Sequence, residues 1–168
     1  MTKIALIGPG AIGGAVAVRL MQTPRSIVTV CARTPITSLT LEDAAGTVTM
    51  SPEVLLSPDQ GHPVDWILVA TKAYDAAGAA AWFPGLMGPG TRVAVLQNGV
   101  EHVERFAPYV EVSRIVPVIV TMPVERIGPG LFKQRRKGHL AVASGANGRP
   151  SLNSFGIAGL TFLSLPIS

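Results

Sequence analysis

The chain has few cysteines, few charged residues and no long apolar run, and each of these excludes a class of protein. Its 168 residues include one cysteine, Cys31, which excludes an internal disulfide and is expected to be inert packing in a core strand. Charged residues make up 14% of the chain, against roughly 25% in an average soluble domain. Its apolar runs are shorter than the roughly 18 residues of a membrane span. We therefore expect no membrane partner, a cytoplasmic location and one domain with a proper core.

Nucleic-acid and metal binding are not expected either. The net charge of +4 is mild, and the basic residues cluster only in "KQRRK" (133–137), which we interpret as an exposed turn. A nucleic-acid site would interleave aromatic side chains with these charges, and only Phe132 is near. No metal-ligand spacing occurs in the sequence. His62 and His102 are expected to be solvated, and His139 to be structural.

The chain does contain a regular alternation of strand-like and helix-like runs. The strand-like runs are Ile4–Ile7, Ile27–Ala32, Thr47–Met50, Trp66–Ala70, Arg92–Leu96 and Ile115–Val120. Helix-like stretches follow the first, fourth and fifth of these, at Ala11–Met21, Asp75–Trp82 and Val100–Ala107. Strands separated by helices favour parallel crossover connections. We predict an α/β fold with a doubly wound, mostly parallel sheet and Ile4–Ile7 as a central strand.

The pattern changes after Met122. Two extended runs, Leu131–Arg135 and His139–Ala143, flank the basic turn and predict a C-terminal β-hairpin. Residues 1–145 are therefore expected to form one domain. Residues 146–168 are expected to be a tail of uncertain structure.

The stretch "KIALIGPGAIGGAVAVRL" (3–20) reads as a strand, a glycine turn and a helix. Gly8, Gly10 and Gly13 form G-x-G-x-x-G, in which the first glycine permits a tight turn, the second lets backbone approach a pyrophosphate, and the third lets helix pack on strand. The following helix N-terminus offers free N–H groups to phosphates. This context favours a Rossmann-type dinucleotide site over a glycine turn without a ligand. The cofactor-binding run is Gly8, Pro9, Gly10, Ala11, Ile12 and Gly13.

Arg33, in "VTVCART", lies at the end of the second strand. An NAD-binding protein of this fold would carry an acid there, about 20 residues after the glycine motif, to bind the ribose 2′-hydroxyl. A guanidinium can instead hold a 2′-phosphate through two parallel hydrogen bonds, and Thr34 can add a hydroxyl. The alternative is a solvated arginine at a strand end. We favour NADP as the cofactor.

Polar residues also follow the fourth and fifth strands. Thr71 and Lys72 come after "WILVA", and Asn98 lies in "LQNGVE". Ligands of open α/β sheets bind beyond the carboxyl ends of the strands. Lys72 can meet a cofactor phosphate or a substrate carboxylate, and Asn98 a ribose hydroxyl or the substrate. Taken singly, each is better explained as a surface lysine or a turn residue, but together they indicate one crevice.

With these residues in place, the chain resembles the ketopantoate reductase (2-dehydropantoate 2-reductase) family over about residues 3–145. The segments "IALIGPGAIGG", "CART", "VATKAYD" and "LQNGVE" fall in the order and spacing of the family. The later "GPGLFKQRRKGHLAVAS" looks like the hairpin that closes its N-terminal domain. The resemblance implies NADPH-dependent reduction of a 2-keto acid, 2-dehydropantoate to pantoate, in pantothenate biosynthesis. It also implies that the glycines and Arg33 hold NADP, and that Lys72 and Asn98 face cofactor and substrate.

The family has a second, helical domain that supplies a lysine as general acid, and no lysine follows Lys137 here. The catalytic residue of this chain is therefore unknown, and a positioned acid typically contributes ~10²–10⁴-fold. We expect a reductase that is catalytically incomplete as this chain alone, with a homodimer or a complementing chain as partner. The alternatives are a non-catalytic NADP-binding module or remnant, or one half of a split reductase.

Overall fold

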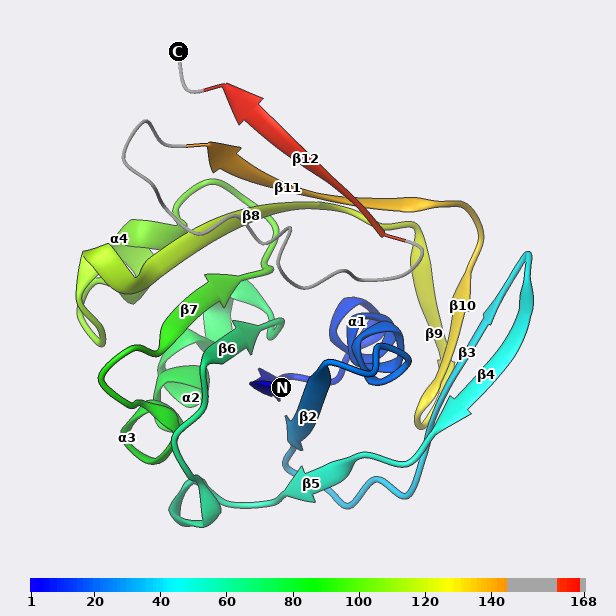
Figure 1. Ribbon diagram of the computed structural model, residues 1–168, viewed down its shortest axis with the longest axis horizontal. Coiled ribbons are helices and arrows are strands. Elements are labelled where there is room, and N and C mark those ends of the chain that lie inside the picture. Colours follow the sequence, from blue (N-terminus) through cyan, green and yellow to red (C-terminus); the bar gives the residue numbers. More distant parts are fainter. Residues whose placement is uncertain (145–159, 167–168) are drawn as a thin grey trace.

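The computed structural model describes residues 1–144 and 160–166 (Figure 1). The larger of its two sheets contains β1 (Thr2–Ile7), β2 (Ser26–Cys31), β5 (Glu53–Leu55), β6 (Trp66–Val69), β7 (Arg92–Val95), β8 (Ile115–Thr121), β11 (Gly138–Ser144) and β12 (Leu160–Pro166). The order is β12-β11-β8-β7-β6-β1-β2-β5. The strands from β8 to β5 in this order run parallel, and β11 is antiparallel to β8. The predicted mostly parallel, doubly wound sheet is confirmed.

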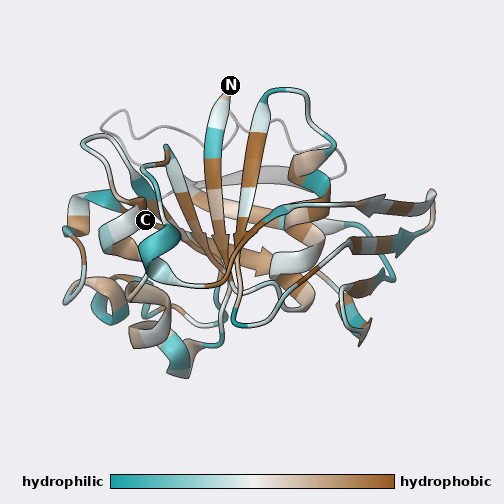
Figure 2. Cartoon of the chain, turned by 90° about the horizontal axis from the view of Figure 1, so that it is seen from below, coloured by the Kyte–Doolittle hydropathy of each residue, from teal (hydrophilic) through white to brown (hydrophobic). Residues whose placement is uncertain are grey.

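The strand β1 lies inside this sheet, hydrogen-bonded to β2 and β6 on its two sides. Successive side chains of a strand point to opposite faces, and both faces of β1 are apolar. Ile4 and Leu6 belong to the core cluster on one side, and Ala5 and Ile7 to the cluster on the other. Figure 2 shows the central strands as hydrophobic along most of their length. Burial on both faces explains why the strand reads as a continuous apolar run.

Helices cover both faces of the large sheet (Figure 1). On one face lies α1 (Ala11–Met21), and on the other lie α2 (Ala76–Ala80), α3 (Phe83–Leu86) and α4 (His102–Phe106). Single 3₁₀ turns occur at Pro58–Gln60, Ala73–Asp75 and Val112–Arg114. The helix predicted over Asp75–Trp82 corresponds to α2. A separate helix, α3, follows it and has Pro84 in its first turn. No helix in the described ranges is long and apolar enough to cross a membrane.

A second sheet covers the outer side of α1. It consists of β3 (Leu39–Asp43), β4 (Gly46–Met50), β9 (Val124–Gly128) and β10 (Leu131–Gln134), in the order β4-β3-β10-β9. Figure 1 shows α1 enclosed between the two sheets. The packing is close: a Cβ on Gly14 would lie 2.0 Å from the ring of Phe132. Only a glycine in α1 permits this approach.

The C-terminal hairpin was predicted between β10 and β11, but it lies between β9 and β10. The runs at Leu131–Arg135 and His139–Ala143 are strands, but β10 pairs with β9, whereas β11 pairs with β8 and β12. The hairpin turn is Pro129–Gly130, where Gly130 has a φ of +66° that favours glycine. The exposed basic residues 135–137 instead connect the two sheets. Within the predicted tail, residues 160–166 form β12, and its other residues lie outside the described part of the chain.

An ion pair ties α1 to the small sheet. The Arg19 guanidinium, in the last turn of α1, pairs with the Asp43 carboxylate at the end of β3, and the two side chains are 12% and 18% exposed. Arg19 also donates to Gln134 Oε1 at 3.3 Å. The hydrogen bond from Arg19 is the main reason why the pKa of Asp43 lies below its usual range.

Replacing Asp43 with asparagine should lower the free energy of unfolding by about 1.5–3 kcal/mol near neutral pH, since a charge-assisted hydrogen bond is lost. Folding lowers the pKa of Asp43. The ion pair therefore contributes fully to stability above the pKa that this carboxyl has in the unfolded chain. The contribution is lost as the pH falls toward the pKa in the folded protein. The difference between the two proteins should therefore shrink in acid. Denaturant unfolding at several pH values measures it, with exposed Asp59→Asn as the control. A difference that is independent of pH would contradict the ion pair.

Candidate functional site

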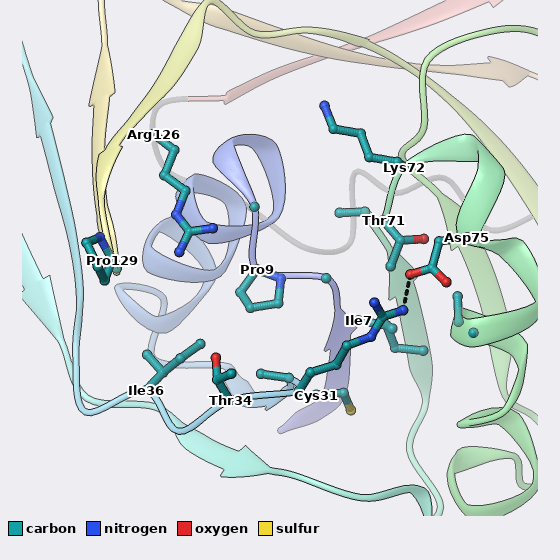
Figure 3. Close-up of a pocket in the computed structure, with 18 of the residues that line it drawn as sticks. Ile7, Pro9, Cys31, Thr34, Ile36, Thr71, Lys72, Asp75, Arg126 and Pro129 are labelled. Carbon is teal, nitrogen blue, oxygen red and sulfur yellow. Dashed lines mark hydrogen bonds and ion pairs between the residues drawn. The ribbon is translucent and has the colours of Figure 1, made fainter.

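A cavity of about 440 Å³ lies beyond the carboxyl ends of β1, β2 and β6 (Figure 3). This is the edge at which open α/β sheets bind ligands. Its walls come from the turn after β1, the loop after β2, the segment after β6 and the β9–β10 hairpin. The described lining includes Gly8, Pro9, Gly10, Arg33, Thr34, Thr71, Lys72, Tyr74, Asp75, Gly78, Arg126, Pro129 and Gly130.

The three glycines of the turn meet three different steric conditions. Gly8 has a φ of +90°, and a Cβ there would lie 2.7 Å from Thr71 Cγ2. A Cβ on Gly13 would lie 2.2 Å from the carbonyl oxygen of Gly8, so the helix and the turn are in direct backbone contact. A Cβ on Gly10 would meet nothing within 4 Å. Packing within the protein therefore explains Gly8 and Gly13, and it does not explain Gly10.

The N-terminus of α1 lies at the cavity, where no side chain of the described residues caps it. Gly10 is its N-cap, no side chain caps the helix, and its first turn carries no acid. The first N–H groups of a helix lack partners inside the helix and carry partial positive charge. Such an end binds phosphate readily. Ala11 and Ile12 form this first turn, so the predicted run from Gly8 to Gly13 is assembled as one loop and helix start.

Arg33 follows β2 and lines the cavity, as Thr34 does. Its Nη2 donates to the carboxylate of Asp75, and the two side chains are 77% and 26% exposed. The dashed line in Figure 3 ends on Asp75. Gly78 makes this pair possible, because a Cβ there would lie 2.2 Å from Asp75 Oδ1 and 3.0 Å from Arg33 Nη2. Asp75 was not among the predicted site residues, because only the tertiary structure brings it to Arg33.

Lys72 reaches the cavity, whereas Asn98 does not line it. Both follow parallel neighbouring strands, β6 and β7, and both are exposed. Gln97 connects the two strand ends: its Nε2 donates to Thr71 Oγ1 at 3.1 Å and to the Lys72 carbonyl at 3.3 Å. The structure thus brings Thr71 and Lys72 to the glycine turn and holds Asn98 at the adjacent strand end.

His102 was expected to be solvated, and this was wrong. Its side chain is buried, with Nε2 2.8 Å from the carbonyl oxygen of Gln97. A carbonyl only accepts, so Nε2 carries the hydrogen, and burial lowers the pKa of the ring. Arg105, one turn further along α4, donates to Gln97 Oε1 at 2.9 Å. The first turn of α4 therefore faces inward and supports the segment before Asn98. His62 is exposed, as predicted.

Cys31 lies in β2 and is buried, as predicted. Burial raises the pKa of its thiol to about 12. The thiolate is the nucleophilic form, so this side chain is inert at neutral pH. No group of His, Cys, Asp or Glu side chains suited to holding a metal occurs within residues 1–144 and 160–166.

Taken together, a parallel sheet, a glycine turn after its inner strand and an open helix N-terminus define a Rossmann-type dinucleotide-binding fold. The family model described as "Ketopantoate reductase PanE/ApbA" matches residues 4–147. The chain belongs to this family.

Curated relatives are similar over most of this chain. A 2-dehydropantoate 2-reductase of Caulobacter vibrioides is 48% identical over 148 residues, covering 88% of this chain and 51% of that protein. One from Mycobacterium tuberculosis is 38% identical over 146 residues, covering 86% and 49%. The chain thus spans about half the length of the curated relatives it matches.

Solved structures show the same fold. The 2-dehydropantoate 2-reductase from Geobacter metallireducens has a TM-score of 0.85 and 22% identity, covering 97% of this chain and 57% of its own. D-mandelate dehydrogenase, solved with NADH and anilino(oxo)acetate, has a TM-score of 0.80 and 21% identity, covering 96% and 56%.

Gly10→Ala should weaken binding of NADPH by about tenfold or more with little change in thermal stability, because its Cβ would enter open space where a pyrophosphate is expected. Gly13→Ala should instead destabilise the fold by about 1–3 kcal/mol through overpacking. Gly90→Ala, which also meets open space, is the matched control. Thermal unfolding and fluorescence titration with NADPH separate the effects. Normal binding by Gly10→Ala would exclude a phosphate at this position.

Proposed function

We propose that this chain forms the NADPH-binding part of a cytoplasmic 2-dehydropantoate 2-reductase, which reduces the 2-keto group of its substrate to a hydroxyl in pantothenate biosynthesis. The observation that carries the proposal is the opening of the glycine turn and Arg33 onto one cavity. Family membership and the names of the curated relatives support it. A dimer or a complementing chain stays a prediction.

The residues present fit a dinucleotide phosphate. Gly10 leaves open space beside a helix N-terminus that has neither a side-chain cap nor an acid. In the proposal, the turn of residues 8–13 holds the pyrophosphate, and the hydrogen bonds come from the backbone N–H groups at the start of α1. The N–H groups of Gly8 and Gly10 already donate to the carbonyl oxygens of Cys31 and Gly8, and Pro9 has no N–H. Arg33, assisted by Thr34, holds the 2′-phosphate, because two donor pairs of a guanidinium match phosphate geometry. When bound, the nicotinamide supplies the hydride for the reduction.

Lys72 and Asn98 are proposed to hold the substrate end. A 2-keto acid carries a carboxylate, and Lys72 provides a cation at the cavity without a carboxylate partner among the described residues. Thr71, beside it, lies against the glycine turn. Because Gln97 binds Thr71 and the Lys72 carbonyl, the backbone that carries Lys72 is held in place. Asn98 adds an amide at the neighbouring strand end, for a ribose hydroxyl or the substrate.

We expect the protein to bind NADPH at least tenfold more tightly than NADH, since a charge-assisted arginine–phosphate contact contributes roughly 1.5–3 kcal/mol. Arg33→Asp should weaken NADPH binding and narrow this difference, with little change for NADH. Arg25→Ala removes an exposed arginine that precedes β2 and serves as the control. Titration of each protein with both nucleotides measures the ratio. Equal affinities in the unmodified protein would contradict a 2′-phosphate site.

Produced as these 168 residues, the protein should bind NADPH but oxidise it with 2-dehydropantoate far more slowly than the roughly 10 s⁻¹ of a median enzyme. The reason is that the family resemblance assigns the general acid to a lysine outside this segment. Lys72 is the one lysine among the described lining residues. Absorbance of NADPH with and without the keto acid gives the rate. Fast turnover that Lys72→Met abolishes would show that Lys72 supplies the proton instead.

A further inference from the structure

The charges that line the cavity do not balance. The described charged residues of its lining are Arg33, Lys72, Asp75 and Arg126. Asp75 pairs with Arg33, so that the charge of this arginine is already offset before any ligand binds. Lys72 and Arg126 form no ion pair with the described part of the chain. The cavity therefore carries uncompensated positive charge from Lys72 and Arg126. Of these two, Arg126 belongs neither to the glycine motif nor to a strand end of the parallel sheet.

The terminal donors of Arg126 have no ion-pair partner among the described residues. It lies in β9, and its Nε donates to the carbonyl oxygen of Gly128 at 3.3 Å. Its Nη1 and Nη2 have no carboxylate partner in the described residues, although an acid is adjacent: Glu125 pairs with Arg135 at 2.7 Å instead. Figure 3 shows the Arg126 side chain extending into the cavity, with Lys72 and Asp75 on the opposite side.

The hairpin that carries Arg126 is joined to the loop that follows Arg33. Thr40 N–H donates to the Gly130 carbonyl at 2.7 Å, and β10 runs parallel to β3. The turn also lies directly on this loop, because a Cβ on Gly130 would be 2.4 Å from the carbonyl oxygen of Ser38. The base of Arg126 is thus fixed relative to the segment that begins with Arg33.

Resting on the proposed function, we propose that Arg126 is a second specificity-determining residue for NADPH and contacts its 2′-phosphate opposite Arg33. A phosphate monoester carries about −1.5 to −2 charges at neutral pH. The Arg33–Asp75 pair as a whole has no net charge, although Arg33 still offers donors, whereas Arg126 adds a full positive charge. The pyrophosphate is met by backbone N–H groups at the start of α1 and needs no arginine. The remaining anion of NADPH is the 2′-phosphate. Arg126 lies in the β9–β10 hairpin, which is hydrogen-bonded to the segment that follows Arg33.

The test compares two ligands that differ only in this phosphate: 2′-phospho-ADP-ribose and ADP-ribose. Arg126→Gln should weaken binding of the first by about tenfold or more, the loss expected for one charge-assisted hydrogen bond, and change the second less than about twofold. Added salt should reduce the effect, because the site is exposed. Isothermal titration calorimetry of the purified protein measures both affinities.

Arg135→Gln is the matched control, since it removes the same charge from the segment just after β10 of the same hairpin but lies outside the described cavity lining. It should leave both affinities within about twofold, the range expected for long-range charge effects alone. Thermal unfolding should be unchanged in Arg126→Gln, whose side chain makes one hydrogen bond. Equal weakening of both ligands would assign Arg126 to the pyrophosphate, and no weakening would leave it without a ligand; either result overturns the inference. An unmodified protein that binds neither ligand would contradict the proposed function itself.

Discussion

The backbone contact between Gly13 and Gly8 is the constraint on which the site depends. With 2.2 Å between an imagined Gly13 Cβ and the Gly8 carbonyl, any side chain would push α1 off the turn. Gly8 is in turn close to Thr71, so the turn, the helix and the segment after β6 have no free space between them. This close packing directs the first N–H groups of α1 beyond the sheet edge.

Enclosing α1 between two sheets gives the helix its unusual composition. Every residue from Gly13 to Val18 is buried, because the large sheet covers one side and the small sheet the other. Small side chains suit this layer, and Gly14 allows Phe132 to approach. Arg19 is the polar exception, and its carboxylate partner Asp43 comes from the small sheet. The same sheet then supplies the β9–β10 hairpin as a wall of the cavity, so the cover of the helix also contributes to the site.

The strand ends beyond β6 and β7 show how buried polar groups position exposed ones. Gln97 is 3% exposed and uses both ends of its amide, to Thr71 and Lys72 on one side and to Arg105 on the other. A buried amide with these partners satisfied is costly to displace. Lys72 and Asn98 are therefore exposed side chains on backbone that hydrogen bonds hold in place. This arrangement is expected of residues that contact a ligand.

Local patterns in the sequence determined the inner strands of the large sheet, α1 and the glycine turn, because apolar runs, glycine spacing and helix formers act over a few neighbouring residues. The short or half-exposed strands β3, β5 and β9 were not predicted. They also placed Arg33, Thr71 and Lys72 at strand ends that the parallel sheet brings to one edge. The dipeptide Pro129–Gly130 is typical of a hairpin turn, but the turn was predicted at the basic run that follows it. The tertiary structure alone decided that His102 is buried, that Asp75 pairs with Arg33, and that Arg126 enters the cavity. Arg33 and Asp75 are far apart in the chain, and the parallel strands β2 and β6 bring them to one sheet edge. Arg126 reaches the cavity because the small sheet packs on α1. His102 bonds to the nearby Gln97, and its burial depends on the packing of α4 against the large sheet.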